Sequence, residues 1–341
     1  MTASNGANGS GDRPVVSVVI STYNRSGDLH DTLRALLDQT LDPAHYEVLV
    51  VDNNSTDATR AVVESVAATS GGRVRYLFEA QQGVSFGRNA GIRASAAPLV
   101  AFTDDDVIPE PAWLANIVRA FERHAHVDYL SGKILPLFAT PPADWLDFRN
   151  SGPCTIRDRG DTPMFSTPGH FFPGWATANL AIRRSMLDRS GLFAENFPRG
   201  EDLEFIIRVW RAGGRGMYAP DVVVSHKIPA ERITKAYHRM WHGREGAIRA
   251  RVRYKELFDG SGALTSPKRA AHLLGAPAFL YRELLQLTVQ WLKAAVRGDG
   301  TEAFFHESQA RQTFTYLRTR IAEWAARRGP AAATAGRQRA G

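Results

Sequence analysis

Cysteine is nearly absent from this chain of 341 residues, because Cys154 is the only one and no internal disulfide is possible. This composition fits a reducing compartment. Long apolar runs are missing too, since no uncharged stretch reaches the roughly 20 residues that a membrane-spanning helix needs. We therefore expect a cytoplasmic protein that does not cross a membrane.

The two ends of the chain contain few large apolar residues. The first residues lack the apolar segment of a signal peptide, so we expect a disordered leader over 1–13. The last residues read PAAATAGRQRAG, and we expect a disordered tail over 329–341.

Acidic residues are outnumbered, since 42 Lys and Arg against 35 Asp and Glu give a formal net charge of +7. A basic balance suits phosphate-bearing ligands, acidic lipid surfaces or nucleic acid. Basic residues are concentrated between Glu231 and Glu256, on a stretch that we expect to be helical. We expect no nucleic-acid binding, because no recognisable nucleic-acid module accompanies them.

The first half of the chain alternates short apolar runs with helical patterns. Because each run is apolar on both faces, we predict a parallel sheet covered by helices on both sides. The second half is mixed up to about residue 230, and helical beyond it. The predicted strands are 15–20, 46–51, 73–79, 98–102, 127–136, 175–182 and 216–226, the predicted helices include 57–68, 84–96 and 201–213, and 148–174 is predicted to be a long loop.

Polar clusters follow several of the predicted strands directly. The segment STYNR follows the first strand, DNNSTD the second and TDDD the fourth. Ligands of parallel sheets bind outside the carboxyl ends of the strands, and these clusters fall at that edge. The pattern therefore indicates a binding site there.

The most unusual of these clusters is Asp104, Asp105 and Asp106 in the segment TDDD. Adjacent carboxylates repel one another unless a cation lies among them. Mg²⁺ and Mn²⁺ prefer carboxylate oxygens and often share them with substrate phosphates. The alternative is a surface turn ahead of Pro109.

Other polar residues at this edge have both a functional and a structural interpretation. Asp52 ends a strand where acidic side chains of nucleotide-binding folds accept hydrogen bonds from ribose or base. Arg88 lies in GVSFGRNAGI and is suited to a phosphate or to the aspartates, whereas the glycines there permit close helix packing. Glu201 and Asp202 begin a helix, where the helix dipole alone favours carboxylates. His226 ends a strand, and a lone histidine there is ordinarily packed or solvated.

These segments together resemble glycosyltransferase family 2, a family of inverting enzymes of the GT-A type. The resemblance covers about residues 14–230 and is carried, in order, by VSVVISTYNR, EVLVVDNNSTD, GVSFGRNAGI, FTDDDVIPEPAWL, GWATANLAIRR and GEDLEF. It implies an α/β GT-A fold, with a Rossmann-like nucleotide-binding half and a mixed central sheet, plus a helical C-terminal extension. The implied domains are a catalytic domain 14–230, made of a nucleotide-binding half 14–110 and an acceptor half 111–230, and a helical region 231–328.

The resemblance also implies a uridine diphosphate (UDP) sugar donor, a Mn²⁺ or Mg²⁺ cofactor, and an acceptor hydroxyl on a glycan, a lipid-linked molecule or a small molecule. Asp202 matches the general base, with Glu201 beside it. The implied metal ligands are Asp104, Asp106 and His226. Asp105 is a substitute ligand, because three consecutive aspartates leave the register of the family's D-x-D motif open. The residues implied to contact the nucleotide sugar are Thr22, Tyr23, Arg25, Asp52, Asn54, Arg88, Asp104, Asp105 and Trp175.

The C-terminal region leaves two interpretations open. Leu280, Leu284, Leu287 and Trp291 line one face of a predicted helix. This face either packs on the catalytic domain or lies in a membrane interface, which would give a peripheral membrane contact through 231–297 on the inner face of the cytoplasmic membrane. The Q-x-x-R-W signature of processive polymerases has only a loose analogue in HRMWHGREG, which favours single transfer.

Two other functions compete with sugar transfer. A nucleotidyltransferase of sugar phosphates shares the nucleotide-binding half, but it ordinarily needs a Gly-rich loop with a basic residue after the first strand, and STYNRSGD has none. A non-catalytic protein that binds nucleotide sugars is the second alternative. The presence of both TDDD and GED in the sequence argues against it.

Overall fold

The computed structural model describes residues 13–166, 170–171, 175–197, 199–258 and 271–328. The expected leader, except for Arg13, and the expected tail lie outside these ranges. The chain divides into two compact units. The sheet unit comprises Met1–Leu135, Arg157–Pro168 and Phe172–Lys227, and the helical unit comprises Pro136–Ile156, Gly169–Phe171 and Ile228–Gly341. Residues 136–156, which the sequence analysis assigns to the acceptor half, thus cluster with the C-terminal helices.

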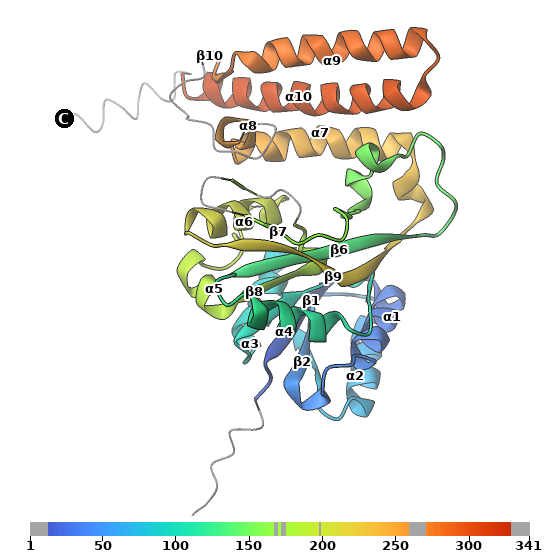
Figure 1. Ribbon diagram of the computed structural model, residues 1–341, viewed down its shortest axis with the longest axis vertical. Helices are drawn as coiled ribbons and strands as arrows, with labels where there is room; N and C mark the ends of the chain where they lie inside the picture. The colour runs from blue at the N-terminus through green and yellow to red at the C-terminus, as the bar shows by residue number, and fades with distance from the viewer. Residues whose placement is uncertain (1–12, 167–169, 172–174, 198, 259–270, 329–341) are drawn as a thin grey trace, which may run out of the picture. The chain divides into compact units, whose positions relative to one another are not determined.

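Among the described residues, nine strands form one mixed sheet in the order β3-β2-β1-β4-β8-β6-β9-β5, and β7 pairs with β9 (Figure 1). Strands β3, β2, β1 and β4 are parallel, as their apolar runs predict. Strand β8 runs antiparallel to β4 and to β6, which makes the sheet mixed. The strands are β1 Val16–Thr22, β2 Tyr46–Asp52, β3 Val74–Phe78, β4 Leu99–Phe102, β5 Val107–Pro109, β6 Tyr129–Phe138, β7 Met164–Phe165, β8 Leu180–Arg183 and β9 Gly216–Ile228.

Several helices of the sheet unit pack against this sheet. In α1, Leu29, Leu33 and Leu36 are fully buried in the main core at the spacing of a helical face. Helix α3 approaches β1 closely, since a Cβ on Gly91 would lie 2.4 Å from Cγ1 of Val19. The helices of this unit are α1 Ser26–Leu37, α2 Thr59–Thr69, α3 Val84–Ala94, α4 Trp113–Arg123, α5 Arg184–Ser190 and α6 Glu201–Arg211, with a 3-10 turn η1 at Pro43–His45.

The predicted strand 175–182 is correct only in its second part. Residues Thr177–Asn179 form a 3-10 turn, η4, and β8 begins at Leu180. The buried side chain of Asn179 explains the turn, because its amide group donates to the carbonyls of Lys133 and Val222, both at 2.9 Å. These bonds tie the turn to β6 and β9.

The predicted loop 148–174 contains short elements. It includes the 3-10 turns η2 Phe148–Asn150 and η3 Gly152–Cys154, as well as β7. Each is held by local hydrogen bonds or by pairing with β9. Because such short elements do not depend on an apolar face, they leave little apolar periodicity in the sequence.

In the helical unit, α10 lies between α7 and α9 (Figure 1). The core of the helical unit contains Ala250, Ala276, Leu280, Tyr316 and Leu317. None of the helices in the described part of the chain combines the length and apolarity needed to cross a membrane. The elements are η5 Ala230–Ile233, α7 Lys235–Arg251, α8 Tyr254–Leu257, β10 His272–Leu273, β11 Ala276–Pro277, α9 Phe279–Val296 and α10 Gly300–Ala326.

The face of α9 that the sequence analysis singled out is the packed one. Leu280 is fully buried, and Leu284 packs against the core of the helical unit. Leu287 and Trp291 are partly buried on the same face. Packing within the helical unit therefore accounts for Leu280 and Leu284 on this face.

Candidate active site

The acidic triplet occupies the turn between β4 and β5. Asp105 and Asp106 are buried, and Asp104 is partly exposed. Thr22, at the end of β1, donates its hydroxyl to Oδ2 of Asp105 at 2.7 Å. Nη1 of Arg25 lies 2.5 Å from Oδ2 of Asp106 and 3.6 Å from Oδ1 of Asp105. A guanidinium therefore offsets part of the repulsion among the carboxylates.

Strand β9 brings His226 to the triplet. It pairs antiparallel with β5, so that Val107 stands opposite His226. Nε2 of the buried His226 lies 3.5 Å from Oδ1 of Asp106. The next residue, Lys227, donates its backbone N–H to the carbonyl of Asp106 at 2.9 Å. Residues that are far apart in the sequence thus meet around one carboxylate.

Arg88 connects the triplet to the start of α6. Its side chain is buried, with Nη1 at 2.8 Å from Oε1 of Glu201. Nη2 donates to the hydroxyl of Thr177 at 2.8 Å and lies 3.5 Å from Oδ1 of Asp104. Its guanidinium carbon also lies 5.4 Å from the ring centroid of Phe193, at cation–π distance. This arginine thus links α3, η4, the β4–β5 turn and α6.

Glu201 and Asp202 are adjacent but have different surroundings. Glu201 is buried and paired with Arg88. Asp202 is partly exposed, and its Oδ1 accepts the backbone N–H of Leu203 at 2.7 Å. Of the two carboxylates, Asp202 is therefore the one with access to solvent.

Asp52 ends β2 with both carboxylate oxygens engaged. Oδ2 accepts the hydroxyl of Tyr76 at 2.9 Å, and Oδ1 accepts the N–H of Ser55 at 2.8 Å. Burial raises the pKa of Tyr76 to about 12, and the hydrogen bond to Asp52 adds to the rise. Asp52 is thus part of the turn itself.

The loops after β1 and β2 carry the other predicted nucleotide contacts. Tyr23 and Asn54 are exposed on them. The two loops are joined, because Oδ1 of Asn24 accepts the N–H of Thr56 at 2.7 Å. Trp175 is buried, and its Nε1 has no hydrogen-bond partner among the described residues.

The electrostatics of the triplet favour a further cation. Burial raises the pKa of the Asp105 carboxyl to about 7, against the hydrogen bond from Thr22 and the charge of Arg25, while the neighbouring carboxylates add to the rise. Burial also raises the pKa of Asp104, against the charge of Arg88. Burial thus opposes the ionised form of these carboxyls, and a cation beside them would favour it.

The residues at this position fit a divalent cation that is shared with a ligand. Across the described ranges, no group of three or more His, Cys, Asp or Glu side chains is arranged to hold a metal ion. Asp106 and His226 nevertheless present adjacent ligand atoms, with Asp104 in the same turn. Mg²⁺ is typically held by one or two carboxylates, with phosphate oxygens and water completing its shell.

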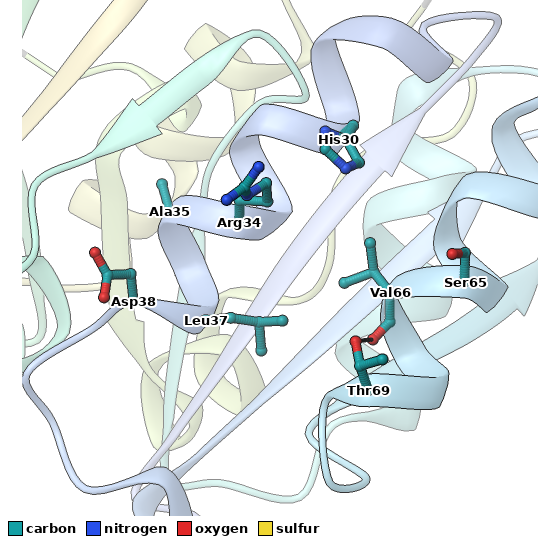
Figure 2. Close-up of a pocket in the computed structure, with 8 residues that line it drawn as sticks. All are labelled: His30, Arg34, Ala35, Leu37, Asp38, Ser65, Val66 and Thr69. Carbon is teal, nitrogen blue, oxygen red and sulfur yellow. Dashed lines mark hydrogen bonds between the residues drawn. The ribbon is translucent and has the colours of Figure 1, made fainter.

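A separate pocket lies between α1 and α2 (Figure 2). It does not include any of the predicted site residues among those that line it. Its lining residues are His30, Arg34, Ala35, Leu37, Asp38, Ser65, Val66 and Thr69. It is therefore distinct from the cluster around the acidic triplet.

Several contributors to the site were missed in the sequence. Thr177, which binds Arg88, lies in the GWATAN segment, so its neighbourhood was predicted although its role was not. Tyr76 belongs to β3 and carried no signal beyond its strand pattern. Lys227, beside His226, binds Asp31 at 2.7 Å and had no signal other than its charge.

Comparison with protein families settles the class. A family described as Glycosyl transferase family group 2 matches residues 99–292, and Glycosyl transferase family 2 matches residues 17–160. The chain belongs to glycosyltransferase family 2. The predicted family and the predicted enzyme class, a glycosyltransferase, are thereby confirmed.

Individual relatives of this glycosyltransferase agree. Glycosyltransferase AglE of Haloferax volcanii is 29% identical over 232 residues, which cover 67% of this chain and 73% of that protein. Validoxylamine A glucosyltransferase of Streptomyces hygroscopicus subsp. limoneus is 42% identical over 109 residues, covering 31% of this chain and 24% of its own length. This second relative is therefore matched over a quarter of its length only.

Solved structures confirm the GT-A fold with a helical C-terminal part. The mannosyltransferase PcManGT from Pyrobaculum calidifontis, in complex with GDP-Man and Mn²⁺, superposes with a TM-score of 0.54 at 22% identity, over 96% of this chain and 80% of that one. S. aureus TarS 1–349, in complex with UDP-GlcNAc, gives a TM-score of 0.53 at 17% identity, over 90% and 91%.

Proposed function

We propose that this glycosyltransferase moves a sugar from a UDP-sugar to an acceptor hydroxyl, with inversion at the anomeric carbon and with Mn²⁺ or Mg²⁺ as cofactor. One observation carries the proposal: Arg88 contacts both Asp104 of the acidic triplet and Glu201, the residue before Asp202. One connected cluster thus contains residues that suit a diphosphate. The same cluster contains a carboxylate that suits proton removal.

The donor binds across the loops after β1 and β2 in this proposal. Thr22, Tyr23 and Asp52 hold the uracil, and Asn54 lies beside them. The exposed ring of Tyr23 and the buried side chains of Thr22 and Asp52, at the ends of neighbouring strands, support this assignment, because a flat base needs a platform and nearby acceptors. Trp175, whose buried N–H has no acceptor in the described structure, is assigned to a hydroxyl of the donor sugar.

Asp106 and His226 would hold the divalent cation, with Asp104 as a further ligand and Asp105 as its substitute. A cation bound there would supply positive charge against the diphosphate leaving group. Arg88 and Arg25 add fixed positive charge on the same side. Arg25 contacts Asp106 directly, so it must share or yield that carboxylate when the cation binds.

Asp202 is the general base. It accepts the proton of the acceptor hydroxyl, whose oxygen attacks the anomeric carbon from the face opposite the diphosphate. The bond between sugar and diphosphate breaks, and UDP leaves with the electron pair. Glu201 takes no proton in this scheme, because its pairing with Arg88 gives it a positioning role.

The acceptor is a glycan, a lipid-linked molecule or a small molecule, and transfer is single rather than processive. The segment HRMWHGREG, which is only a loose analogue of the Q-x-x-R-W signature, lies on α7 in the helical unit. A cytoplasmic location fits a nucleotide-sugar donor.

Product analysis with a panel of nucleotide sugars and Mn²⁺ tests the proposal. We expect one UDP-sugar to release UDP, faster when the acceptor is present. Release of pyrophosphate would instead indicate nucleotidyl transfer. Donor binding with no product of either kind would indicate a non-catalytic binding protein and would overturn the proposal.

A further inference from the structure

Helix α9 carries a stripe of exposed apolar side chains. Leu285, Val289, Leu292 and Val296 are 65%, 41%, 55% and 88% exposed. They are spaced four, three and four residues apart, so they lie on one face of the helix. We refer to these four residues as the α9 stripe. Scattered single apolar residues on a surface need no explanation, but a contiguous row does.

The opposite side of α9 accounts for its packing, so the stripe is not needed for the fold. Leu280 and Ala294 are fully buried, and α9 packs against α10 and β11. Figure 1 shows α9 beside α10 in the helical unit. Further exposed apolar side chains precede the stripe in the same unit, namely Leu273, Leu274 and Phe279.

The exposed charges of α9 itself and of its C-cap are basic, and the exposed acidic residue that follows, Asp299, caps α10. The exposed charged residues of α9 and its C-cap are Arg282, Lys293 and Arg297. The acidic residue of the helix, Glu283, binds Nζ of Lys255 at 2.7 Å and accepts the hydroxyl of Thr313 at 3.1 Å. Its charge is therefore compensated within the helical unit.

We propose that the α9 stripe lies in the surface of a bilayer that contains anionic lipids. An amphipathic helix with apolar residues on one face and basic residues beside them binds at the boundary between headgroups and acyl chains. Each exposed Lys or Arg adds attraction to an anionic leaflet. A second copy of the chain suits this face less, because two stripes in contact would bring the basic residues of both copies together.

The inference does not rest on sugar transfer, and its test measures binding alone. The full chain is mixed with vesicles of phosphatidylglycerol and phosphatidylcholine, and separately with phosphatidylcholine vesicles, and bound protein is measured by flotation. We expect binding to the anionic vesicles that weakens with salt. The absence of flotation with anionic vesicles at low salt would overturn the inference.

Two variants and a control locate the contact. Leu285→Gln with Leu292→Gln should reduce the partition coefficient about tenfold or more, because two large apolar side chains no longer enter the lipid. Arg282→Gln with Lys293→Gln should weaken binding to anionic vesicles and leave binding to neutral ones unchanged. Leu137→Gln with Phe148→Gln is the control, since these residues are 51% and 63% exposed outside α9.

Sedimentation of the same proteins decides between a bilayer and a second copy. We expect the wild type and the Leu285→Gln, Leu292→Gln variant to have the same mass in solution. A wild-type dimer that the variant converts to a monomer would show that a second copy covers the stripe, and would overturn the inference. Equal vesicle binding by this variant and the control would also overturn it.

Discussion

The guanidinium of Arg88 and the carboxylate of Glu201 form a buried ion pair at 2.8 Å, between residues that are 113 positions apart in the sequence. The pair joins α3 to the first residue of α6. Asp202 follows directly, and its position relative to Asp104 therefore depends on a contact that involves neither of them. An ion pair of this kind holds geometry, and removing one partner costs about 3–5 kcal/mol.

Substitutions at the two adjacent carboxylates should separate chemistry from folding. Asp202→Asn should lower the transfer rate about 10²–10⁴-fold, because the base is lost, while donor affinity and unfolding temperature stay unchanged. Rates of UDP release, calorimetry with the donor and thermal unfolding measure the three quantities. Donor affinity that falls in parallel with the rate would refute the assignment of Asp202 as base.

Glu201→Gln should instead lower both the stability of the fold and donor affinity. It leaves Arg88 without its charged partner, so the free energy of unfolding should fall by up to about 3–5 kcal/mol and donor affinity should fall with it. Glu204→Gln is the matched control on the same helix, because Glu204 pairs with Arg208 at a partly exposed position. If Glu201→Gln unfolds like this control, the ion pair has no positioning role.

Asp106→Ala should abolish the part of donor affinity that depends on Mn²⁺. Asp106 is the carboxylate that both Arg25 and His226 approach, so its loss removes the adjacent ligand pair. Calorimetric titration of the donor, with and without Mn²⁺, measures the effect. Asp28→Ala is the control, since Asp28 also approaches Arg25 but lies on α1, outside the triplet. Unchanged metal dependence in Asp106→Ala would refute its role as ligand.

The first half of the fold was predictable because its elements carry strong periodicity. The four parallel strands are apolar on both faces, and Leu29, Leu33 and Leu36 mark the inner face of α1. The short elements β5 and β7 were not predictable, since a strand of two or three residues exists only through its partner, here β9. Asn179 shows the same limit, because its turn depends on carbonyls of distant strands.

The residue types of the site were predictable, but their pairings were not. The acidic triplet, Arg88 and His226 stood out by their position at strand ends or in a glycine-rich segment. That Arg25 binds Asp106 and Arg88 binds Glu201 depends on tertiary packing across 81 and 113 residues. The sequence of α9 marked the face with Leu280 and Leu284 as apolar, but left open whether that face packs on protein or lies in a membrane interface.

Gly87→Ala should destabilise the sheet unit by about 1–3 kcal/mol. A Cβ at this position would lie 2.2 Å from Oγ of Ser21, so α3 would have to move away from β1. Gly27→Ala is the control in α1, where no atom lies within 4 Å of the added Cβ, and it should stabilise by about 0.5–1 kcal/mol. Thermal or urea unfolding measures both. A Gly87→Ala variant as stable as the wild type would show that α3 does not pack as described.

The helical unit should lose stability in acid through two buried histidines of α7. The pKa of both His238 and His242 is lowered from 6.5 to about 4, chiefly by burial, with the charges of His238, Arg249 and Arg311 contributing to the shift of His242. Between these values the folded state binds fewer protons than the unfolded state, so stability rises with pH. The stability of the folded state that depends on these histidines is at its full value above pH 6.5 and falls as the pH is lowered toward 4. The loss amounts to about 3 kcal/mol for each histidine.

His242→Leu should flatten this pH dependence by the share of one histidine. Neither ring nitrogen of His242 has a hydrogen-bond partner in the described part of the chain, so the substitution removes a titrating group without breaking a bond. Unfolding temperatures between pH 4 and pH 8 measure the effect, with His45→Leu as the control at an exposed position. We expect the variant to exceed the wild type in stability at pH 5 by more than at pH 7.5. Parallel profiles for His242→Leu and the wild type would show that this histidine has the same pKa in the folded and unfolded states, and that α7 is less tightly packed than its burial indicates.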